Sequence, residues 1–93
     1  MLHIAGKLTL QDEGVVRGAL LSHFGADATS LVCDVSDLLD PDASTLDVLA
    51  RLQLSAARLG GRILLRGTPK QLGELLLLAG LDEILPTEAP SGV

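Results

Sequence analysis

The chain has 93 residues, enough for one folded domain but not for two. Its seven Lys and Arg residues are scattered and outnumbered by twelve Asp and Glu residues, giving a formal net charge of −5. Because there is no Tyr or Trp to interleave with a basic patch, the composition argues against a nucleic-acid-binding protein. Phe24 is the single aromatic residue, so the core must be built from aliphatic side chains.

Cysteine content and hydropathy indicate the compartment. Cys33 is the only cysteine, so no internal disulfide can form, which fits a reducing environment. No apolar run approaches the ~20 residues of a membrane span, and no signal-peptide pattern is present. We therefore expect a cytoplasmic protein that does not insert into a membrane.

The first third of the chain has the pattern of a strand followed by a helix. Leu2–Gly6 is short and apolar, as expected for a strand that ends at glycine. Thr9 and Asp12 have the spacing of a capping box, which predicts that a helix begins there. One helical face then carries Val16, Ala19, Leu20, His23 and Phe24, and Gly25 is placed to end the helix.

The middle of the chain repeats this order. Ser30–Val35 is a continuous apolar run, typical of a strand that is covered on both faces. Asp40 and Pro41 have the residue types of an N-cap and a first-turn position, so they predict the start of a second helix. That helix is expected to run to about Leu59 and to end at Gly60 and Gly61.

The last third predicts one more strand and helix. Arg62–Gly67 reads as a strand, and a third helix is expected from Thr68-Pro69 to Ala79-Gly80. Leu81–Leu85 could form a last strand or a turn. The segment 86–93 contains two prolines and no periodicity, so we expect one domain over residues 1–85 and a flexible C-terminal tail over 86–93.

The predicted fold is α/β, a small and mostly parallel sheet with alternating helices in the order β-α-β-α-β-α. Sites in such sheets lie beyond the carboxyl ends of the strands. The stretch DLLDPDASTLDVLARL (Asp37–Leu52) follows the second predicted strand and is therefore the first place to look for a site. Acidic and hydroxyl side chains crowd into its beginning: Asp37, Asp40, Asp42, Ser44, Thr45 and Asp47.

Three interpretations of this acidic stretch differ in chemistry. Helix capping and complementarity to the helix dipole explain it without any ligand. Oxygen ligands from Asp34, Asp37, Asp40 and Asp42 would suit Mg²⁺ or Ca²⁺, but their spacing matches no calcium loop, and we predict no metal site. A catalytic carboxylate pair would need a positioning shell that the sequence does not supply.

Other candidate chemistry is also absent from the sequence. His3 and His23 have no Cys or Glu at ligand spacing, and Cys33 lies mid-strand, where a thiol is inert. No glycine-rich phosphate loop follows a strand. We therefore predict a protein that is not an enzyme and that has no catalytic residues and no cofactor.

Leucine is present in excess of what one helical face needs. Leu72, Leu75, Leu76 and Ala79, with Leu78 at the edge, form an inward stripe on the third predicted helix; Leu46, Leu49, Leu52, Ala56 and Leu59 form one on the second. Leu54 and Leu77 point away from these stripes and are candidates for an oligomer interface. The alternative is that they are singly exposed leucines of the kind that most surfaces carry.

The chain resembles a STAS domain, the fold of bacterial anti-sigma factor antagonists and of sulfate-transporter tails. The resemblance rests on the strand LVCDVSDL, the helix start DASTLDVLARL, the turn GGRILL, the ending LLLLAGLDEILP and the first turn GKLTL. It implies a STAS-like fold that lacks the strand which usually precedes Leu2–Gly6, leaving that strand with an open edge for a partner or a second copy to cover.

The resemblance also implies a function. Anti-sigma factor antagonists bind an anti-sigma factor, often a serine kinase, through the loop and start of the second helix, and phosphorylation of a serine directly after an aspartate abolishes binding. Asp42 and Leu46 match that motif, but Ala43 replaces the acceptor serine. Ser44 and Thr45 are the neighbouring hydroxyls that could be phosphorylated instead.

These features together predict a regulatory interaction module of bacterial transcription without the usual phosphoserine switch. Its partner-binding residues would be Asp37, Asp40, Asp42, Ser44, Thr45 and Asp47. The alternative is a structural STAS subunit of a homo-oligomer, or of a larger complex such as a lipid-transport ATPase.

Overall fold

The computed structural model describes residues 2–24 and 30–87. The elements are β1 (Leu2–Gly6), a short 3₁₀ turn η1 (Leu10–Asp12), α1 (Glu13–His23), β2 (Ser30–Leu38), α2 (Ala43–Arg58), β3 (Arg62–Arg66) and α3 (Lys70–Ala79). The predicted order β-α-β-α-β-α is therefore confirmed. Gly25, expected to end the first helix, lies outside the described residues.

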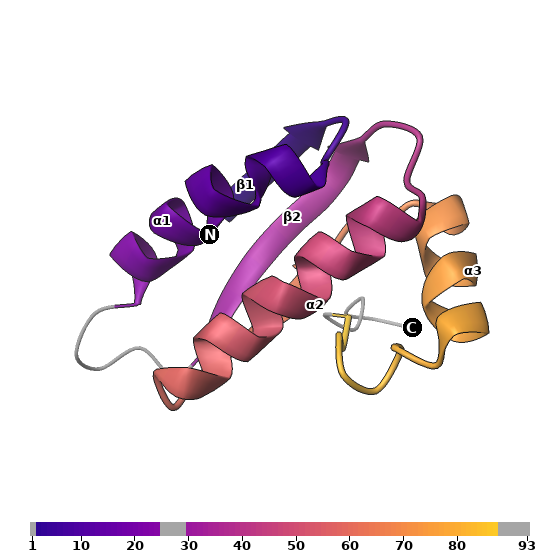
Figure 1. Cartoon of the computed structure of the whole chain (residues 1–93). Coiled ribbons are helices and arrows are strands. Elements are labelled where there is room, and N and C mark those ends of the chain that lie inside the picture. Colours follow the sequence, from indigo (N-terminus) through magenta and orange to yellow (C-terminus); the bar gives the residue numbers. More distant parts are fainter. Residues whose placement is uncertain (1, 25–29, 88–93) are drawn as a thin grey trace.

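The three strands form one parallel sheet in the order β1-β2-β3, with β2 in the centre. The connections from β1 to β2 and from β2 to β3 each lead to the next strand on the same side. Because such parallel connections are right-handed, α1 and α2 lie on the same face of the sheet. Figure 1 shows this arrangement, with α1 and α2 side by side over the sheet and α3 beside the first turns of α2. The result is two layers, one of helices and one of strands.

The prediction that the middle strand is covered on both faces was wrong. Leu31, Cys33 and Val35 point toward the helices and are buried, whereas Val32 and Asp34, on the opposite face, are only half-buried. A run of apolar residues cannot distinguish one covered face from two, because Val32 is apolar on the exposed side as well. Within the described part of the chain, no helix covers this second face of the sheet.

The core lies between the sheet and the helices and is aliphatic, as the composition predicts. Its residues that are closed to solvent include Leu20, Val35, Val48, Leu49, Leu52, Ile63, Leu65, Leu72 and Leu85. Cys33 lies among them, and burial raises the pKa of its thiol to about 11, so it stays protonated and unreactive.

Two leucines expected in the inward stripes are exposed instead. Leu59 follows the last residue of α2 and is 51% exposed, because the chain is already turning toward β3. Leu78 is 85% exposed, since the buried stripe of α3 narrows to Leu72 and Leu76. Leu54 and Leu77, predicted to point outward, are 61% and 67% exposed.

The segment after α3 turns and returns to the sheet. Leu81–Leu85 forms a turn rather than a strand, and the Leu85 side chain is fully buried. The Leu65 N–H then donates to the Pro86 carbonyl at 2.9 Å, and Thr87 forms an isolated parallel bridge with Leu65. The first two residues of the expected tail thus lie against β3; residues 88–93 lie outside the described part.

Gly67, directly after β3, is required by the close approach of β2. Its φ is +68°, and a Cβ built there would lie 2.7 Å from the Ser36 Cβ. We predict that Gly67→Ala lowers the free energy of unfolding by about 1–3 kcal/mol, measured by urea denaturation. The matched control is Gly73→Ala within α3, where a Cβ meets nothing within 4 Å. That control should raise stability by about 0.5–1 kcal/mol, and equal effects of the two changes would contradict the prediction.

Candidate functional site at the start of the second helix

The first turn of α2 is held by a reciprocal cap. The Thr45 N–H donates to Asp42 Oδ1 at 3.2 Å, and the Asp42 N–H donates to Thr45 Oγ1 at 3.1 Å. The prediction that Asp40 is the N-cap was wrong by two residues. Asp42 has the extended backbone of a cap, with φ −143°, whereas Asp40 has φ +45° in the turn before it.

The cap is also tied to the turn after β1. Thr45 is 1% exposed, and its hydroxyl lies 3.4 Å from the Leu8 carbonyl, to which it can donate. This contact joins segments 37 residues apart in the chain. Because the Thr45 hydroxyl is enclosed, a kinase or a binding partner could reach it only after the helix start opened.

Lys7 neutralises part of the acidic loop. Its ammonium donates to Asp42 Oδ2 at 2.7 Å and to the Asp40 carbonyl oxygen. The hydrogen bond from Lys7, followed by the Thr45 N–H, lowers the pKa of the Asp42 carboxyl below its ordinary 3.8. Lys7 thus fixes the shape of the loop by binding both its backbone and its capping side chain.

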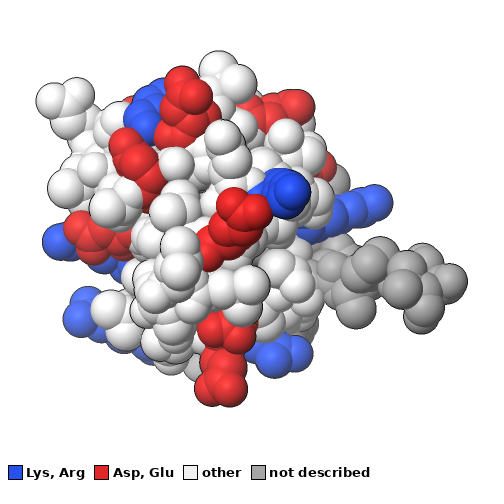
Figure 2. Space-filling view, turned by 90° about the vertical axis from the view of Figure 1, so that its right-hand side faces the viewer, with Lys and Arg blue, Asp and Glu red and all other residues white. Residues whose placement is uncertain are grey.

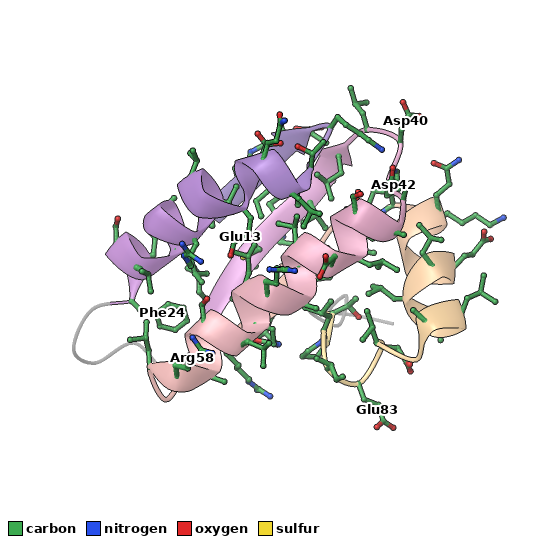
Figure 3. The ribbon with its side chains drawn as sticks, in the orientation of Figure 1. Glu13, Phe24, Asp40, Asp42, Arg58 and Glu83 are labelled. Atoms are coloured by element: carbon green, nitrogen blue, oxygen red, sulfur yellow. The ribbon has the colours of Figure 1, made fainter. Side chains whose placement is uncertain are left out.

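A depression opens between this loop and α3. One wall carries Lys7, Asp40 and Asp42, and the other carries Glu74, Leu75 and Leu78. Figure 3 shows Asp40 and Asp42 together in the loop, and Figure 2 shows uncharged surface bordered by acidic groups on the face that carries α3. Three carboxylates and one ammonium in these walls make the depression acidic, with apolar surface at Leu78.

The structure brings only part of the predicted site together. Asp40 and Ala43 are exposed beside the cap, and Ser44 is half-buried there. Asp37 lies apart on the uncovered sheet face, where its Oδ2 is 2.9 Å from His3 Nε2. Asp47 points along α2 to the Arg51 guanidinium at 3.0 Å. Asp37 and Asp47 therefore flank the acidic loop and do not belong to its centre.

Three of the four aspartates considered for a metal site have separate partners. Asp34 Oδ1 accepts from the Ser36 hydroxyl at 2.6 Å and from its N–H at 3.0 Å, and these bonds lower the Asp34 pKa. Asp37 faces His3, and Asp42 faces Lys7. No group of three or more His, Cys, Asp or Glu side chains placed for a metal occurs in residues 2–24 and 30–87.

Sequence reasoning missed Lys7, Glu74 and Leu78 as parts of this surface. Lys7 carried a signal, because it is the only Lys or Arg before Arg17 and it directly follows a strand. The ends of β1 and β2 meet at the same edge of a parallel sheet, so Lys7 could have been placed beside the loop. Glu74 and Leu78 carried no such signal, since only the docking of α3 brings them there.

Comparison with known protein families supports the fold assignment. Residues 1–86 match the family model described as "Mlab, STAS domain". The chain belongs to the STAS domain family. The resemblance seen in the sequence is thereby confirmed, and the three parallel strands with alternating helices agree with a STAS-like fold. No curated protein matches the chain.

STAS domains are commonly regulatory or protein-interaction modules and are generally non-catalytic. The acidic loop lies at the carboxyl end of the central strand of this STAS domain, where ligands and partners of α/β sheets are usually met. No helix in the described part of the chain is long and apolar enough to cross a membrane.

The buried hydroxyl of Thr45 should contribute measurably to stability. Thr45→Val keeps the side-chain shape but leaves the Asp42 N–H without its acceptor, so we predict a loss of about 1–2 kcal/mol in the free energy of unfolding. Ser44→Ala is the control, because Ser44 is half-buried and takes no comparable part in the cap; it should change stability by less than about 0.5 kcal/mol. Urea denaturation of both variants checks this, and an unaffected Thr45→Val would refute the role of the cap.

The Lys7–Asp42 pair should make folding sensitive to acid. The Asp42 pKa is lower in the folded state than in the unfolded state, so its contribution is present above the ordinary carboxyl pKa and is lost as pH falls through the folded value. Asp42→Asn should therefore lose less stability than wild type between about pH 5 and about pH 2. Lys7→Met should flatten the same profile in part, because the Thr45 N–H still lowers the Asp42 pKa, and the double variant should show the profile of Asp42→Asn. Profiles parallel to wild type would show that the pair does not titrate with folding.

Proposed function

We propose that this STAS protein is a non-catalytic regulatory interaction module, similar to an anti-sigma factor antagonist, that acts in the cytoplasm. Its partner is an anti-sigma factor or another serine-kinase-like regulatory protein. The binding surface is centred on Asp40, Ala43 and Ser44, with Asp37 and Asp47 on its rim. The supporting observation is an exposed acidic loop, tied down by Lys7 and the cap, beside an acidic depression with apolar surface at Leu78, at the carboxyl end of the central strand.

The chemistry of the surface indicates what the partner presents. Asp40 and Glu74 offer carboxylates that no described basic side chain neutralises within hydrogen-bonding distance, and Leu78 offers exposed apolar area in the same depression. A partner segment with an apolar side chain flanked by Lys or Arg would bury Leu78 and pair with both carboxylates. Apolar contact supplies affinity in such an interface, and charge complementarity supplies orientation and specificity.

Ala43 bears on how the binding of the partner is regulated. It is the first residue of α2 and is exposed, at the position where the STAS antagonists carry their acceptor serine. Alanine keeps the helix start but cannot receive a phosphate. Thr45 is enclosed in the cap, which leaves Ser44 as the only other hydroxyl in the loop for a kinase to reach. We therefore propose binding that is constitutive with respect to the usual switch.

A second function is supported by the leucines outside the core. Leu54 and Leu77 expose most of their side chains on different faces of the domain, in the groove between α1 and α2 and on α3. A STAS subunit built permanently into a homo-oligomer, or into a larger complex such as a lipid-transport ATPase, would cover them. Such a subunit would co-purify with its complex in fixed stoichiometry, unlike a reversible regulator.

Affinity purification of the tagged protein from its own cells, with mass spectrometry, tests both functions. We predict that Asp40→Asn and Leu78→Glu each reduce recovery of the specific partner about tenfold or more. Asn is chosen because it tolerates the positive φ of Asp40. The matched control is Glu83→Gln, which removes an exposed carboxylate far from Asp40 (Figure 3) and should leave recovery unchanged.

The identity and behaviour of the partner distinguish the outcomes. A kinase-like regulatory protein lost in both variants supports the regulatory function. A transport ATPase held in fixed stoichiometry supports the structural one. Equal recovery by wild type, Asp40→Asn and Leu78→Glu would disprove this surface, and a phosphate on Ser44 in unbound but not bound protein would disprove constitutive binding.

A further inference from the structure

The two edge strands of the sheet, β3 and β1, differ in whether their outward backbone groups have hydrogen-bond partners. On β3, the Gln53 side chain accepts from the Ile63 N–H at 2.7 Å and donates to the Ile63 carbonyl at 3.2 Å. The Leu65 N–H of the same edge donates to Pro86. The Ile63 N–H and carbonyl and the Leu65 N–H, which face away from β2, are therefore hydrogen-bonded within the chain.

The edge of β1 has no equivalent cover among the described residues. The Gly6 carbonyl accepts from the Leu39 N–H at 3.0 Å, so Gly6 faces β2. Backbone groups alternate along a strand, so Leu2 and Ile4 also face β2, whereas the N–H and C=O groups of His3 and Ala5 point outward. Two donors and two acceptors thus line an unpaired edge, which natural proteins tend to cover.

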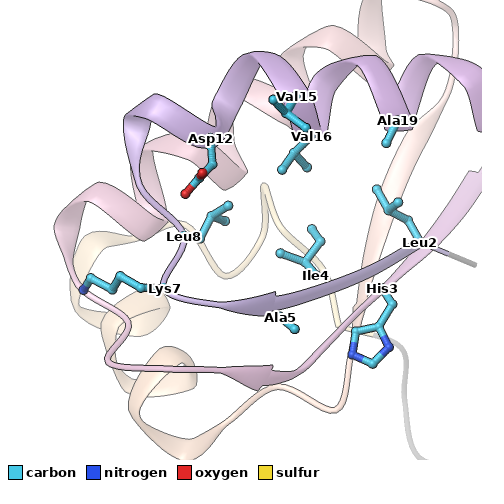
Figure 4. Close-up of a pocket in the computed structure, with 10 residues that line it drawn as sticks. All are labelled: Leu2, His3, Ile4, Ala5, Lys7, Leu8, Asp12, Val15, Val16 and Ala19. Carbon is cyan, nitrogen blue, oxygen red and sulfur yellow. The ribbon is translucent and has the colours of Figure 1, made fainter.

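An apolar groove runs beside this edge, between β1 and α1. Figure 4 shows Leu2, Ile4 and Val16 pointing into the space between strand and helix, while His3 points to the other face of the sheet. Val15, on the helix side of the groove, is 78% exposed. The edge therefore offers hydrogen-bonding groups next to a groove where Val15 leaves an apolar side chain exposed, although Leu2 and Ile4 themselves are buried in the core.

We propose that this edge pairs with β1 of a second copy of the chain, antiparallel and around a two-fold axis at Ile4. His3 of one copy then lies opposite Ala5 of the other, and the two pairs exchange four backbone hydrogen bonds. The axis is perpendicular to the sheet, so both helix layers stay on the same face. The dimer has one continuous sheet of six strands.

The β1 strand of a second copy has the side-chain pattern that fits this edge. Leu2 and Ile4 are the apolar positions of β1, and the two-fold axis places the copy's Leu2 and Ile4 on the groove side. The charged residues of the groove, Lys7 and Asp12, lie near one end of β1, so antiparallel pairing sets them at opposite ends of the interface. No like charges are forced together, and Val15 of each α1 gains an apolar neighbour.

This interface shares Lys7 with the acidic depression and is otherwise separate from the surfaces discussed above. The acidic loop lies at the carboxyl end of the strands, beside α3, and Leu54 and Leu77 lie on other faces of the helix layer. Five paired residues and a short groove are smaller than a standard protein interface, so we expect a reversible dimer rather than an obligate one.

Sedimentation and light scattering of the purified chain over a micromolar to millimolar series test the proposal. Wild type should convert reversibly from monomer to dimer. Ala5→Pro removes an outward N–H, a change that edge strands tolerate, and should abolish the dimer. Val15→Glu places charge in the groove and should do the same. Leu77→Glu, an equal change at similar exposure on α3, is the matched control and should dimerise like wild type.

Hydrogen exchange locates the interface. The His3 and Ala5 amides should gain protection as concentration rises, whereas the Val15→Glu variant should show no such gain. If Ala5→Pro unfolds, as judged by circular dichroism, Val15→Glu decides. Asp40→Asn should still dimerise, so failure of the acidic surface and failure of this edge are distinguishable.

Two results would overturn the proposal. One is a wild type that stays monomeric over the whole series. The other is a dimer that survives Val15→Glu but is dissolved by Leu54→Glu or Leu77→Glu, which would place the interface on the exposed leucines instead.

Discussion

The reciprocal cap between Asp42 and Thr45 is the interaction on which the arrangement of the acidic loop depends. It starts α2 two residues later than the sequence suggests, and it brings Lys7 and the Leu8 carbonyl against the helix. One buried threonine thereby connects the turn after β1, the loop after β2 and the first turn of α2. Asp40 is exposed because the cap belongs to Asp42.

The same cap distinguishes the two hydroxyls at the start of α2. The resemblance to anti-sigma factor antagonists implies contact at the start of this helix, and both Ser44 and Thr45 are candidates by composition alone. Burial distinguishes them, because the Thr45 hydroxyl is buried and hydrogen-bonded within the cap, whereas Ser44 is half-buried at the surface. Ala43, at the position where the resemblance implies an acceptor serine, is exposed beside them.

The second organising feature is a sheet that is covered on one face only. All three strands run in the same direction and follow each other in space, so right-handed connections put the helices in a single layer. Gln53 and Pro86 close one edge of this sheet, and β1 forms the other. The β1 edge, the acidic loop and the exposed leucines are the surfaces of this small domain that we propose for partners.

The sequence by itself determined the order of elements, the aliphatic core and the family, because hydrophobic period, glycine turns and the motifs around Ala43 and Gly80 are local properties of the chain. It did not determine the cap, since Asp40 and Asp42 are both good capping residues and only backbone geometry selects between them. It overestimated the cover of β2 because Val32 is apolar on the exposed face too. Only the tertiary structure placed Lys7, Glu74 and Leu78 in one depression, because these residues come from segments that are distant in the sequence. Only the tertiary structure also showed that Asp37 pairs with His3 and Asp47 with Arg51, outside the centre of the loop. The unpaired outer edge of β1 likewise follows from the way the strands are ordered in the sheet.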